Sequence, residues 1–129
     1  MQNVRHALSQ LGQSLGLPDF SLSAEGHARI CLSNGGAIGF EAIGDELLLT
    51  HVTPAPFISP RQLLEALRLA DVRQHPVPMP VAIGVTGRGN EASLVVSSRI
   101  DASRLGATDL LHALDHLMGW VRQWQAAQT

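Results

Sequence analysis

Apolar side chains recur at helical spacing at the start of the chain. The members of this set are Val4, Ala7, Leu8, Leu11 and Leu15. At 100° per residue they fall within an arc of about 100°, the width of a face that is buried on one surface. Gly16 and Pro18 follow, and neither residue favours continuation of a helix. We therefore predict a first helix that ends near residue 15.

The period of the pattern changes from 3.6 to 2 after this helix. Phe20 and Leu22 alternate with serines, Glu25-Gly26 turns the chain, and three further runs alternate in the same way. Those runs hold Ala28, Ile30 and Leu32, then Ile38, Phe40 and Ala42, then Leu47, Leu49 and Val52. The separators Asn34-Gly35-Gly36 and Gly44-Asp45 accept the positive φ of hairpin turns. The pattern predicts three strands in an antiparallel meander.

A second helix begins after the proline-rich passage 53–58. Ser59 supplies an N-cap, Pro60 a proline at the first helical position, and Gln62 the glutamine of a capping box. The pattern continues to about Asp71 and then meets a second proline-rich passage, 75–80. The passage 53–58 cannot continue a central strand, and both proline-rich passages are too short to separate two cores.

Two strands and a long helix complete the chain. The strands carry Val81, Ile83 and Val85, then Leu94, Val96 and Ser98, with a tight turn at 87–90. Asp101-Ala102-Ser103 precedes a final helix of roughly twenty residues that ends near Gln125. The order is helix, three strands, helix, two strands, helix. The sequence therefore predicts an α+β fold in a single domain over residues 1–129.

The middle helix has a wider apolar face than one sheet can cover. Its apolar residues are Leu63, Leu64, Ala66, Leu67, Leu69 and Ala70. They spread over an arc of about 220°, whereas a helix packed on one surface needs about 100°. The excess predicts a second apolar contact, either with a helix of the same chain or across a subunit interface. A symmetric dimer is the commonest form of such an interface.

Composition and charge exclude several classes of function. The 129 residues are 45% hydrophobic and 16% charged, and no apolar run approaches the roughly 20 residues of a membrane span. The first six residues lack the features of a secretory signal, so we expect a cytoplasmic protein without membrane insertion. A net charge of −2 with neither sign clustered, and only five aromatic residues, argue against nucleic acid as a partner. The single cysteine, Cys31, lies in a strand pattern, and we interpret it as a small buried hydrophobe.

No catalytic residue, metal site or cofactor is predicted. His112 and His116 lie one helical turn apart with Asp109 nearby, but Ala113 stands where a metalloprotease motif requires glutamate. We therefore expect both histidines on a solvated helix face. The glycines of 84–89 are followed by a strand, whereas a phosphate-binding loop opens a helix.

Taken together, the pattern resembles the class I type III secretion chaperones, which escort bacterial effectors. The resemblance rests on Phe20 to Gly26, which is similar to the family's opening strand and turn, and on the three following strands. It also rests on Leu63-Leu64-Glu65-Ala66-Leu67 and on a terminal helix with Trp120 and Trp124. It implies a homodimer that uses the middle helix and the following strand. The residues expected at this interface are Leu64, Leu67, Val81 and Ile83.

The resemblance also implies a partner, the N-terminal segment of a secreted effector held without ATP in an extended form. We place this effector on the first helix and early sheet, where apolar residues exceed what a thin domain needs to bury. The residues expected to bind it are Leu15, Phe20, Leu22, Ile30, Leu32 and Phe40. A regulatory or adaptor protein on the same fold is the alternative. A small-molecule or enzyme domain would require a deep pocket with convergent polar groups.

Overall fold

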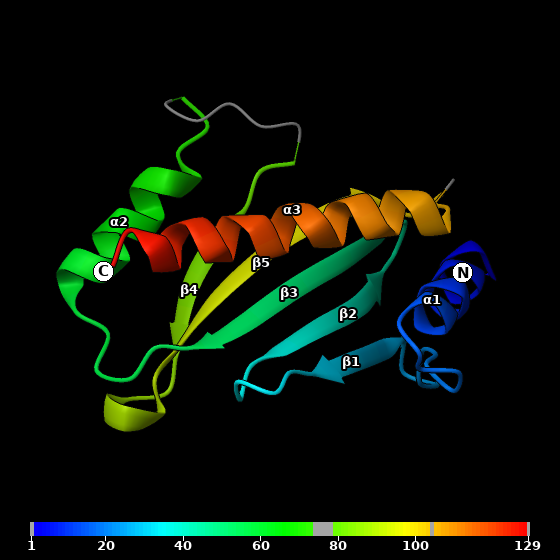
Figure 1. Cartoon of the computed structure of the whole chain (residues 1–129). Helices are drawn as coiled ribbons and strands as arrows, with labels where there is room; N and C mark the ends of the chain where they lie inside the picture. The colour runs from blue at the N-terminus through cyan, green and yellow to red at the C-terminus, as the bar shows by residue number, and fades with distance from the viewer. Residues whose placement is uncertain (1, 74–78, 104, 129) are drawn as a thin grey trace.

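An antiparallel sheet of five strands forms the centre of the structure, a computed structural model that describes residues 2–73, 79–103 and 105–128 (Figure 1). In chain order the elements are α1 (Gln2–Ser14), β1 (His27–Cys31), β2 (Ala37–Ile43), β3 (Glu46–Pro54), α2 (Pro60–Ala70), β4 (Ala82–Thr86), the 3-10 turn η1 (Gly89–Glu91), β5 (Ser93–Asp101) and α3 (Ala107–Ala126). This order confirms the predicted α+β fold. The residues of the second proline-rich passage from 75 to 78 lie outside those that the structure describes.

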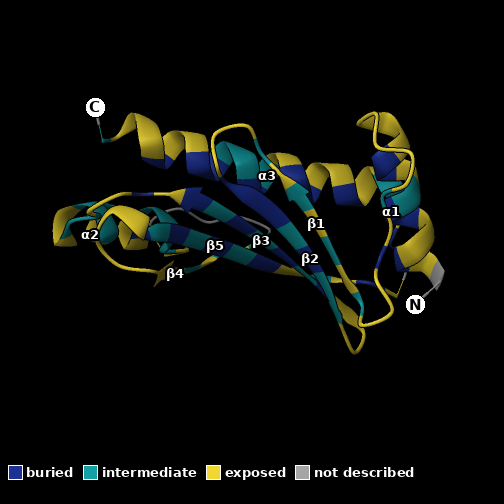
Figure 2. Ribbon diagram, turned by 90° about the horizontal axis from the view of Figure 1, so that it is seen from below, coloured by how far each residue is buried: buried dark blue, intermediate teal, exposed yellow. Residues whose placement is uncertain are grey.

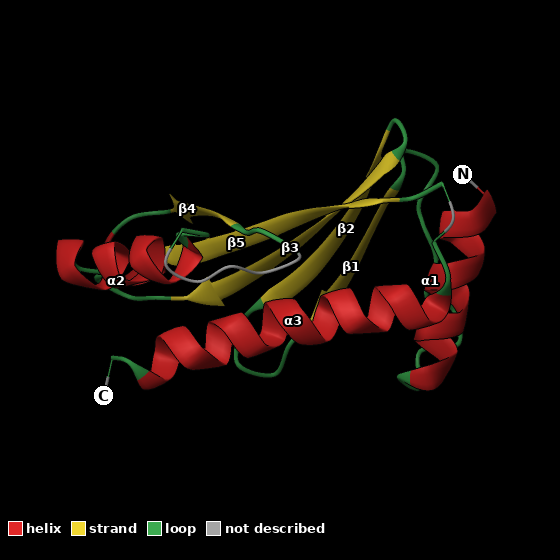
Figure 3. Ribbon diagram, turned by 90° about the horizontal axis from the view of Figure 1, so that it is seen from above, coloured by secondary structure: helices red, strands yellow, loops and turns green. Residues whose placement is uncertain are grey.

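The strands lie in the order β1-β2-β3-β5-β4, and every neighbouring pair is antiparallel. The predicted meander of β1, β2 and β3 is therefore confirmed, and β1 and β4 form the two edges of the sheet. Helix α3 runs along one face, α1 crosses near one end of α3, and α2 packs beside β4 (Figure 3). Among the described residues, no helix covers the opposite face, which we call the bare face.

Strict alternation along β3 explains how the core is divided from the bare face. Leu47 and Leu49 are fully buried beneath α3, whereas Leu48, Thr50 and Val52 point to the other side and are only half-buried. Buried residues of α3 face the buried residues of the sheet (Figure 2). The largest fully buried side chains from the helices include Leu8, Leu11, Leu110 and Leu117.

The start of α2 confirms the capping box expected from its sequence. The Ser59 Oγ accepts a hydrogen bond from the Gln62 backbone N–H at 3.1 Å, and the Gln62 Oε1 accepts one from the Ser59 backbone N–H at 2.8 Å. Two N–H groups that a helix start leaves unpaired are thereby satisfied. The Trp124 Nε1 donates to the Gln62 carbonyl at 3.0 Å, which joins α2 to α3.

Two sequence-based expectations for the early chain are wrong. The alternating run from Phe20 to Ser23 forms no strand, because Phe20 turns inward and its ring meets the edge of Phe40, with centroids 5.6 Å apart. Cys31 is exposed and not buried. It is out of phase with Ala28 and Ile30, whose side chains point into the core, so the pleat of β1 directs Cys31 outward.

None of the described helices combines the length and the apolar character that crossing a membrane requires.

Candidate functional site

The outer edge of β1 carries unpaired backbone groups. Two hydrogen bonds just beyond the ends of β1, from Leu32 N to Gly36 O and from Ala42 N to Gly26 O, are both 2.9 Å long. They show that the even-numbered residues of β1 direct their backbone N–H and C=O groups toward β2. In an antiparallel pair the intervening residues then direct their N–H and C=O groups away from the partner strand. Arg29 and Cys31 are two such residues, and within the described ranges these outward groups have no hydrogen-bond partner.

Ser23 covers the remaining part of this edge. Its backbone N–H donates to the His27 carbonyl at 2.6 Å, and its Oγ accepts from the His27 N–H at 3.2 Å. The open stretch of the edge is therefore short and begins at Arg29. An unpaired stretch of this kind can hydrogen-bond to one extended segment of another chain.

A largely apolar hollow of about 360 Å³, whose lining also holds the charged residues Asp19 and Arg29, lies beside this open stretch. We call it the edge hollow, and its lining includes Leu17, Pro18, Phe20, Ile30 and Cys31. The loop on its α1 side is held in place, because Leu17 N donates to the Gly12 carbonyl at 2.7 Å. Leu15 and Leu17 are both exposed there. The edge of β1 thus offers main-chain hydrogen bonds next to space for an apolar side chain.

The six residues predicted to bind an effector do not form one surface. Phe20 and Ile30 line the edge hollow, Leu15 is exposed nearby, and Leu32 is half-buried just after β1. Leu22 and Phe40 are core residues, with 5% and 2% of their surface exposed. Both are removed from the candidate site, because side chains packed inside the protomer cannot contact a partner.

Leu17 belongs to the edge hollow but was missed from the sequence. Its position outside the core could have been inferred, since a leucine between the helix-ending Gly16 and Pro18 is in phase with neither the helix nor a strand. Cys31 was also missed as a lining residue, because it was assigned to the core.

A second apolar surface lies on α2. Leu64 and Leu67 are 45% and 51% exposed, whereas Ala66 on the same helix is fully buried. Val81 and Ile83, the other residues predicted at a dimer interface, are half-buried and pack against the core of their own protomer. The described residues of the chain therefore cover the wide apolar arc of α2 only in part. The interface assignment itself stays a prediction.

Phe57 is exposed close to the start of α2, and no sequence pattern predicted this exposure. Phe57 is 73% exposed, and its φ of 54° lies in the left-handed region that residues other than glycine seldom adopt. The turn η1 holds it there, because Phe57 N donates to the Gly89 carbonyl at 2.8 Å.

The two histidines of α3 differ in their surroundings. His112 is exposed as expected, but the expectation is wrong for His116, which is half-buried. The His116 Nε2 lies 2.9 Å from the Met79 carbonyl, and since a carbonyl only accepts, this nitrogen is the donor. Over the described ranges, no group of three or more His, Cys, Asp or Glu side chains could hold a metal ion.

Zinc titrated into the protein in a calorimeter is expected to give no stoichiometric submicromolar binding. The reason is that the Nε2 of His116 is already used as a donor and that His112, over the described part of the chain, belongs to no group of three possible ligands. Tight binding that disappears in His112→Ala would contradict this expectation.

His51 is buried beneath α3, and burial lowers the pKa of its imidazole from the ordinary value of 6.5. Its Nδ1 and the Nε1 of Trp120 are buried and have no hydrogen-bond partner among the described residues. Burial in this part of the core therefore favours the neutral imidazole over the charged imidazolium.

The free energy of unfolding is consequently expected to fall at acidic pH. The unfolded chain takes up a proton on His51 below about pH 6.5 and the folded chain does not, so the free energy of unfolding falls as the pH drops below that value. The expected loss is up to about 1.4 kcal/mol per pH unit until the lowered folded pKa is reached. Urea denaturation between pH 7.5 and 5 measures it. His51→Gln should flatten this slope and the exposed-site control His112→Gln should not; equal slopes in all three proteins would contradict the assignment.

Comparison with known proteins gives one family match. A sequence model described as the Tir chaperone protein (CesT) family matches residues 6–125. No curated protein matches the sequence.

Several solved structures share the fold at low sequence identity. A chain of the ExsC–ExsE complex is 16% identical, with 97% of this chain and 92% of that chain covered at a TM-score of 0.73. A chain of the HopA1–SchA chaperone–effector complex is 18% identical, with coverages of 98% and 97% and a TM-score of 0.68. A chain from the structure of the Yersinia pestis type III secretion chaperone SycH, bound to a stable fragment of YscM2, is 16% identical, with coverages of 90% and 94% and a TM-score of 0.66.

Proposed function

The chain belongs to the Tir chaperone protein (CesT) family, and from this premise we propose that it is a non-catalytic cytoplasmic chaperone for a type III secretion effector. It binds an extended segment of the effector and keeps that effector competent for secretion. It acts as a single domain and as a homodimer. The similar structures support a protein partner, since they include a chaperone–effector complex and a chaperone with a bound fragment.

The observation that carries the proposal is the open edge of β1 beside the edge hollow. A bound segment adds a strand at Arg29 and Cys31 through main-chain hydrogen bonds, which contribute affinity whatever the sequence of the segment. Its side chains alternate between the two faces of the sheet, so those on one face enter the edge hollow. Affinity then comes from the backbone, and selectivity comes from the size and spacing of apolar side chains.

The exposed leucines of α2 support the homodimer. Leu64 and Leu67 leave apolar surface uncovered that a second copy would bury, as a self-complementary patch does around a two-fold axis. The two proposed surfaces use different elements, α2 for the dimer and the β1 edge for the effector. A change at one surface should therefore leave the other intact.

The proposed function is tested by purifying the tagged protein from its native cell and identifying what is retained. We expect a secreted protein, held through a protease-resistant segment that can then be synthesised and titrated. Retention of a partner that is not secreted would contradict the effector assignment and favour the regulatory or adaptor role.

Leu17→Asp is expected to weaken binding of that segment at least about tenfold while the melting temperature stays within a few degrees. Leu17 is exposed and lines the edge hollow, so the new charge is solvated in the free protein but faces apolar side chains in the complex. Leu111→Asp provides the matched control, because Leu111 is equally exposed but lies on α3. Equal affinities for the two variants would remove the edge hollow from the binding site.

A further inference from the structure

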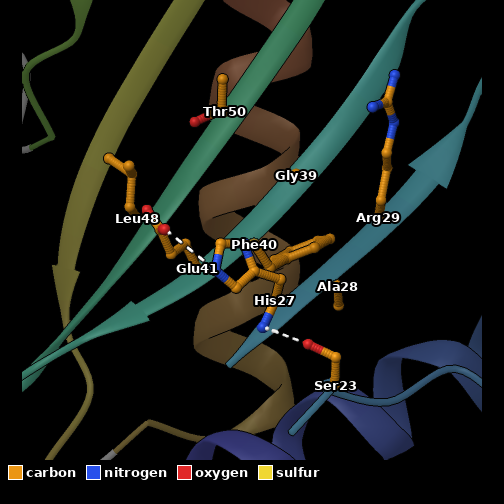
Figure 4. A pocket seen from close by; sticks show the side chains of 9 residues that line it. All are labelled: Ser23, His27, Ala28, Arg29, Gly39, Phe40, Glu41, Leu48 and Thr50. Atoms are coloured by element: carbon orange, nitrogen blue, oxygen red, sulfur yellow. Dashed lines mark hydrogen bonds and ion pairs between the residues drawn. The ribbon is translucent and has the colours of Figure 1, made fainter. Parts of the chain in front are cut away.

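The bare face of the sheet holds a hollow of about 420 Å³ centred on Gly39, which we call the Gly39 hollow (Figure 4). Gly39 pairs with Arg29 on one side and with Thr50 on the other, so three strands meet at its floor. Leu48, His27 and Glu41 also line it. It lies on the bare face of the sheet, and no side chain rises from Gly39 to fill it (Figure 4).

A glycine is unusual in the middle of β2, and the chain itself does not require one there. The register of β2 is regular against both neighbours, so Gly39 marks no bulge, and its φ is not positive. A Cβ at this position would meet only the Cβ of Thr50, at the ordinary contact distance of 4.0 Å. Gly36, by contrast, is needed because a Cβ there would lie 2.6 Å from the Val52 carbonyl. A strand glycine without a local cause often marks the close approach of a ligand.

One of the charged side chains around the Gly39 hollow has no ion-pair partner among the described residues. The His27 Nε2 lies 3.3 Å from a carboxylate oxygen of Glu41, so these two side chains pair with each other. In the part of the chain that the structure describes, the Arg29 guanidinium has neither an ion pair nor a side-chain hydrogen bond. The walls therefore combine apolar surface with one unpaired planar cation.

An aromatic ring matches this combination better than the other side-chain classes. A ring can lie on the uncovered peptide surface of a strand glycine, and a guanidinium binds the face of a ring through its π electrons. A carboxylate would also attract Arg29, but it would approach the carboxylate of Glu41 and leave the apolar walls uncovered. An aliphatic side chain would fill the space but give nothing to the cation.

We propose that the Gly39 hollow binds an aromatic side chain of the partner protein, with the ring on the Gly39 peptide and the Arg29 guanidinium against its face. The inference rests on the proposed function only for the source of this side chain. It adds a specificity element on the bare face, next to the edge hollow, which takes apolar side chains of the strand bound at β1. Arg29 lines both hollows.

Nuclear magnetic resonance of the full-length protein tests the proposal with three capped tripeptides, alanine-X-alanine amides in which X is tryptophan, leucine or glutamate. The tryptophan peptide is expected to shift the Gly39 amide resonance saturably, with a Kd on the order of a few millimolar for so small a ligand. The leucine peptide should bind roughly two- to fivefold more weakly, since it lacks the cation–π contact. The glutamate peptide should bind more weakly still.

Three substitutions make the test specific. Gly39→Val should abolish the saturable shift while the melting temperature holds or rises, because valine favours strands and fits the open space. Ser97→Val is the control, since Ser97 pairs with Thr50 on the bare face but lies outside the hollow. Arg29→Met should remove the preference for tryptophan over leucine. Because Gly39→Val has no glycine amide to observe, the chemical shifts of this variant and of Ser97→Val are followed at the amide of Thr50, which pairs with residue 39.

The proposal is overturned if the tryptophan peptide gives no saturable shift, if the glutamate peptide binds as tightly, or if Gly39→Val binds as the parent does. A Gly39 shift that depends on protein concentration alone would mean that a second copy covers this face, and would overturn it too. Each of these results leaves binding at the β1 edge untouched. Conversely, a protein that binds tryptophan here but retains no secreted partner would contradict the proposed function alone.

Discussion

Replacing both Leu64 and Leu67 by aspartate is expected to convert a dimer into folded monomers. These side chains are about half exposed in the protomer, so a carboxylate at either position stays hydrated in the monomer. In a dimer that buries on the order of 1,600 Å² of surface, the same charges would lose water without gaining a partner, which costs several kcal/mol. Light scattering should give twice the chain mass of 13.8 kDa for the parent and one chain mass for the variant.

Leu111→Asp supplies the control for this experiment. Leu111 on α3 is exposed to a similar degree, so the substitution adds the same charge at a comparable site away from α2. This variant should remain dimeric. A parent protein that is monomeric across micromolar concentrations, or a double aspartate variant that stays dimeric, would show that α2 is not the interface.

Proline at Cys31 is expected to weaken effector binding strongly while the chain still folds. The Cys31 N–H points away from β2, so its loss removes no bond within the sheet, but the ring obstructs a strand added at this edge. Affinity for the retained effector segment should fall by at least about tenfold, as expected when a main-chain bond and the close approach of two strands are lost together.

Two further substitutions separate this effect from other causes. Cys31→Ala removes the thiol and keeps the N–H, so it should bind as the parent does. Ile30→Pro removes an N–H that faces β2 and should destabilise the fold by about 1–3 kcal/mol, because a ladder hydrogen bond is lost. Calorimetric titration and thermal melting of the three variants measure both quantities. Unchanged affinity in Cys31→Pro would exclude strand addition at β1.

Local chemistry allowed much of the fold to be predicted from the sequence. The capping box at Ser59 and Gln62 and the alternation along β3 both act within a few residues, and the structure confirms both. The run from Phe20 to Ser23 was wrongly interpreted as a strand, because alternation also occurs where a side chain packs inward without a partner strand. The periodicity of a short run does not show whether another strand lies beside it.

The candidate site could be predicted only in part, because it depends on contacts between distant residues. Phe40 and Ile30 have the same apolar character, but Phe40 is central in the sheet and Ile30 lies on its edge strand, a difference that strand order alone decides. The Gly39 hollow likewise needs the register that sets Arg29, Gly39 and Thr50 in one row. No local pattern carries this information. For this reason Leu22 and Phe40 were predicted to lie on the binding surface, although both are buried in the core.

Hydrogen exchange of the backbone amides, with and without the effector segment, tests the central claim most directly. In the free protein the N–H groups of Arg29 and Cys31 point to solvent and should exchange fast, whereas the Ile30 N–H faces β2 and should be protected. Binding of the segment is predicted to slow exchange at Arg29 and Cys31, because both amides gain main-chain acceptors. If both continue to exchange as in the free protein while new protection appears only on the exposed face of α3, the partner does not add a strand at β1.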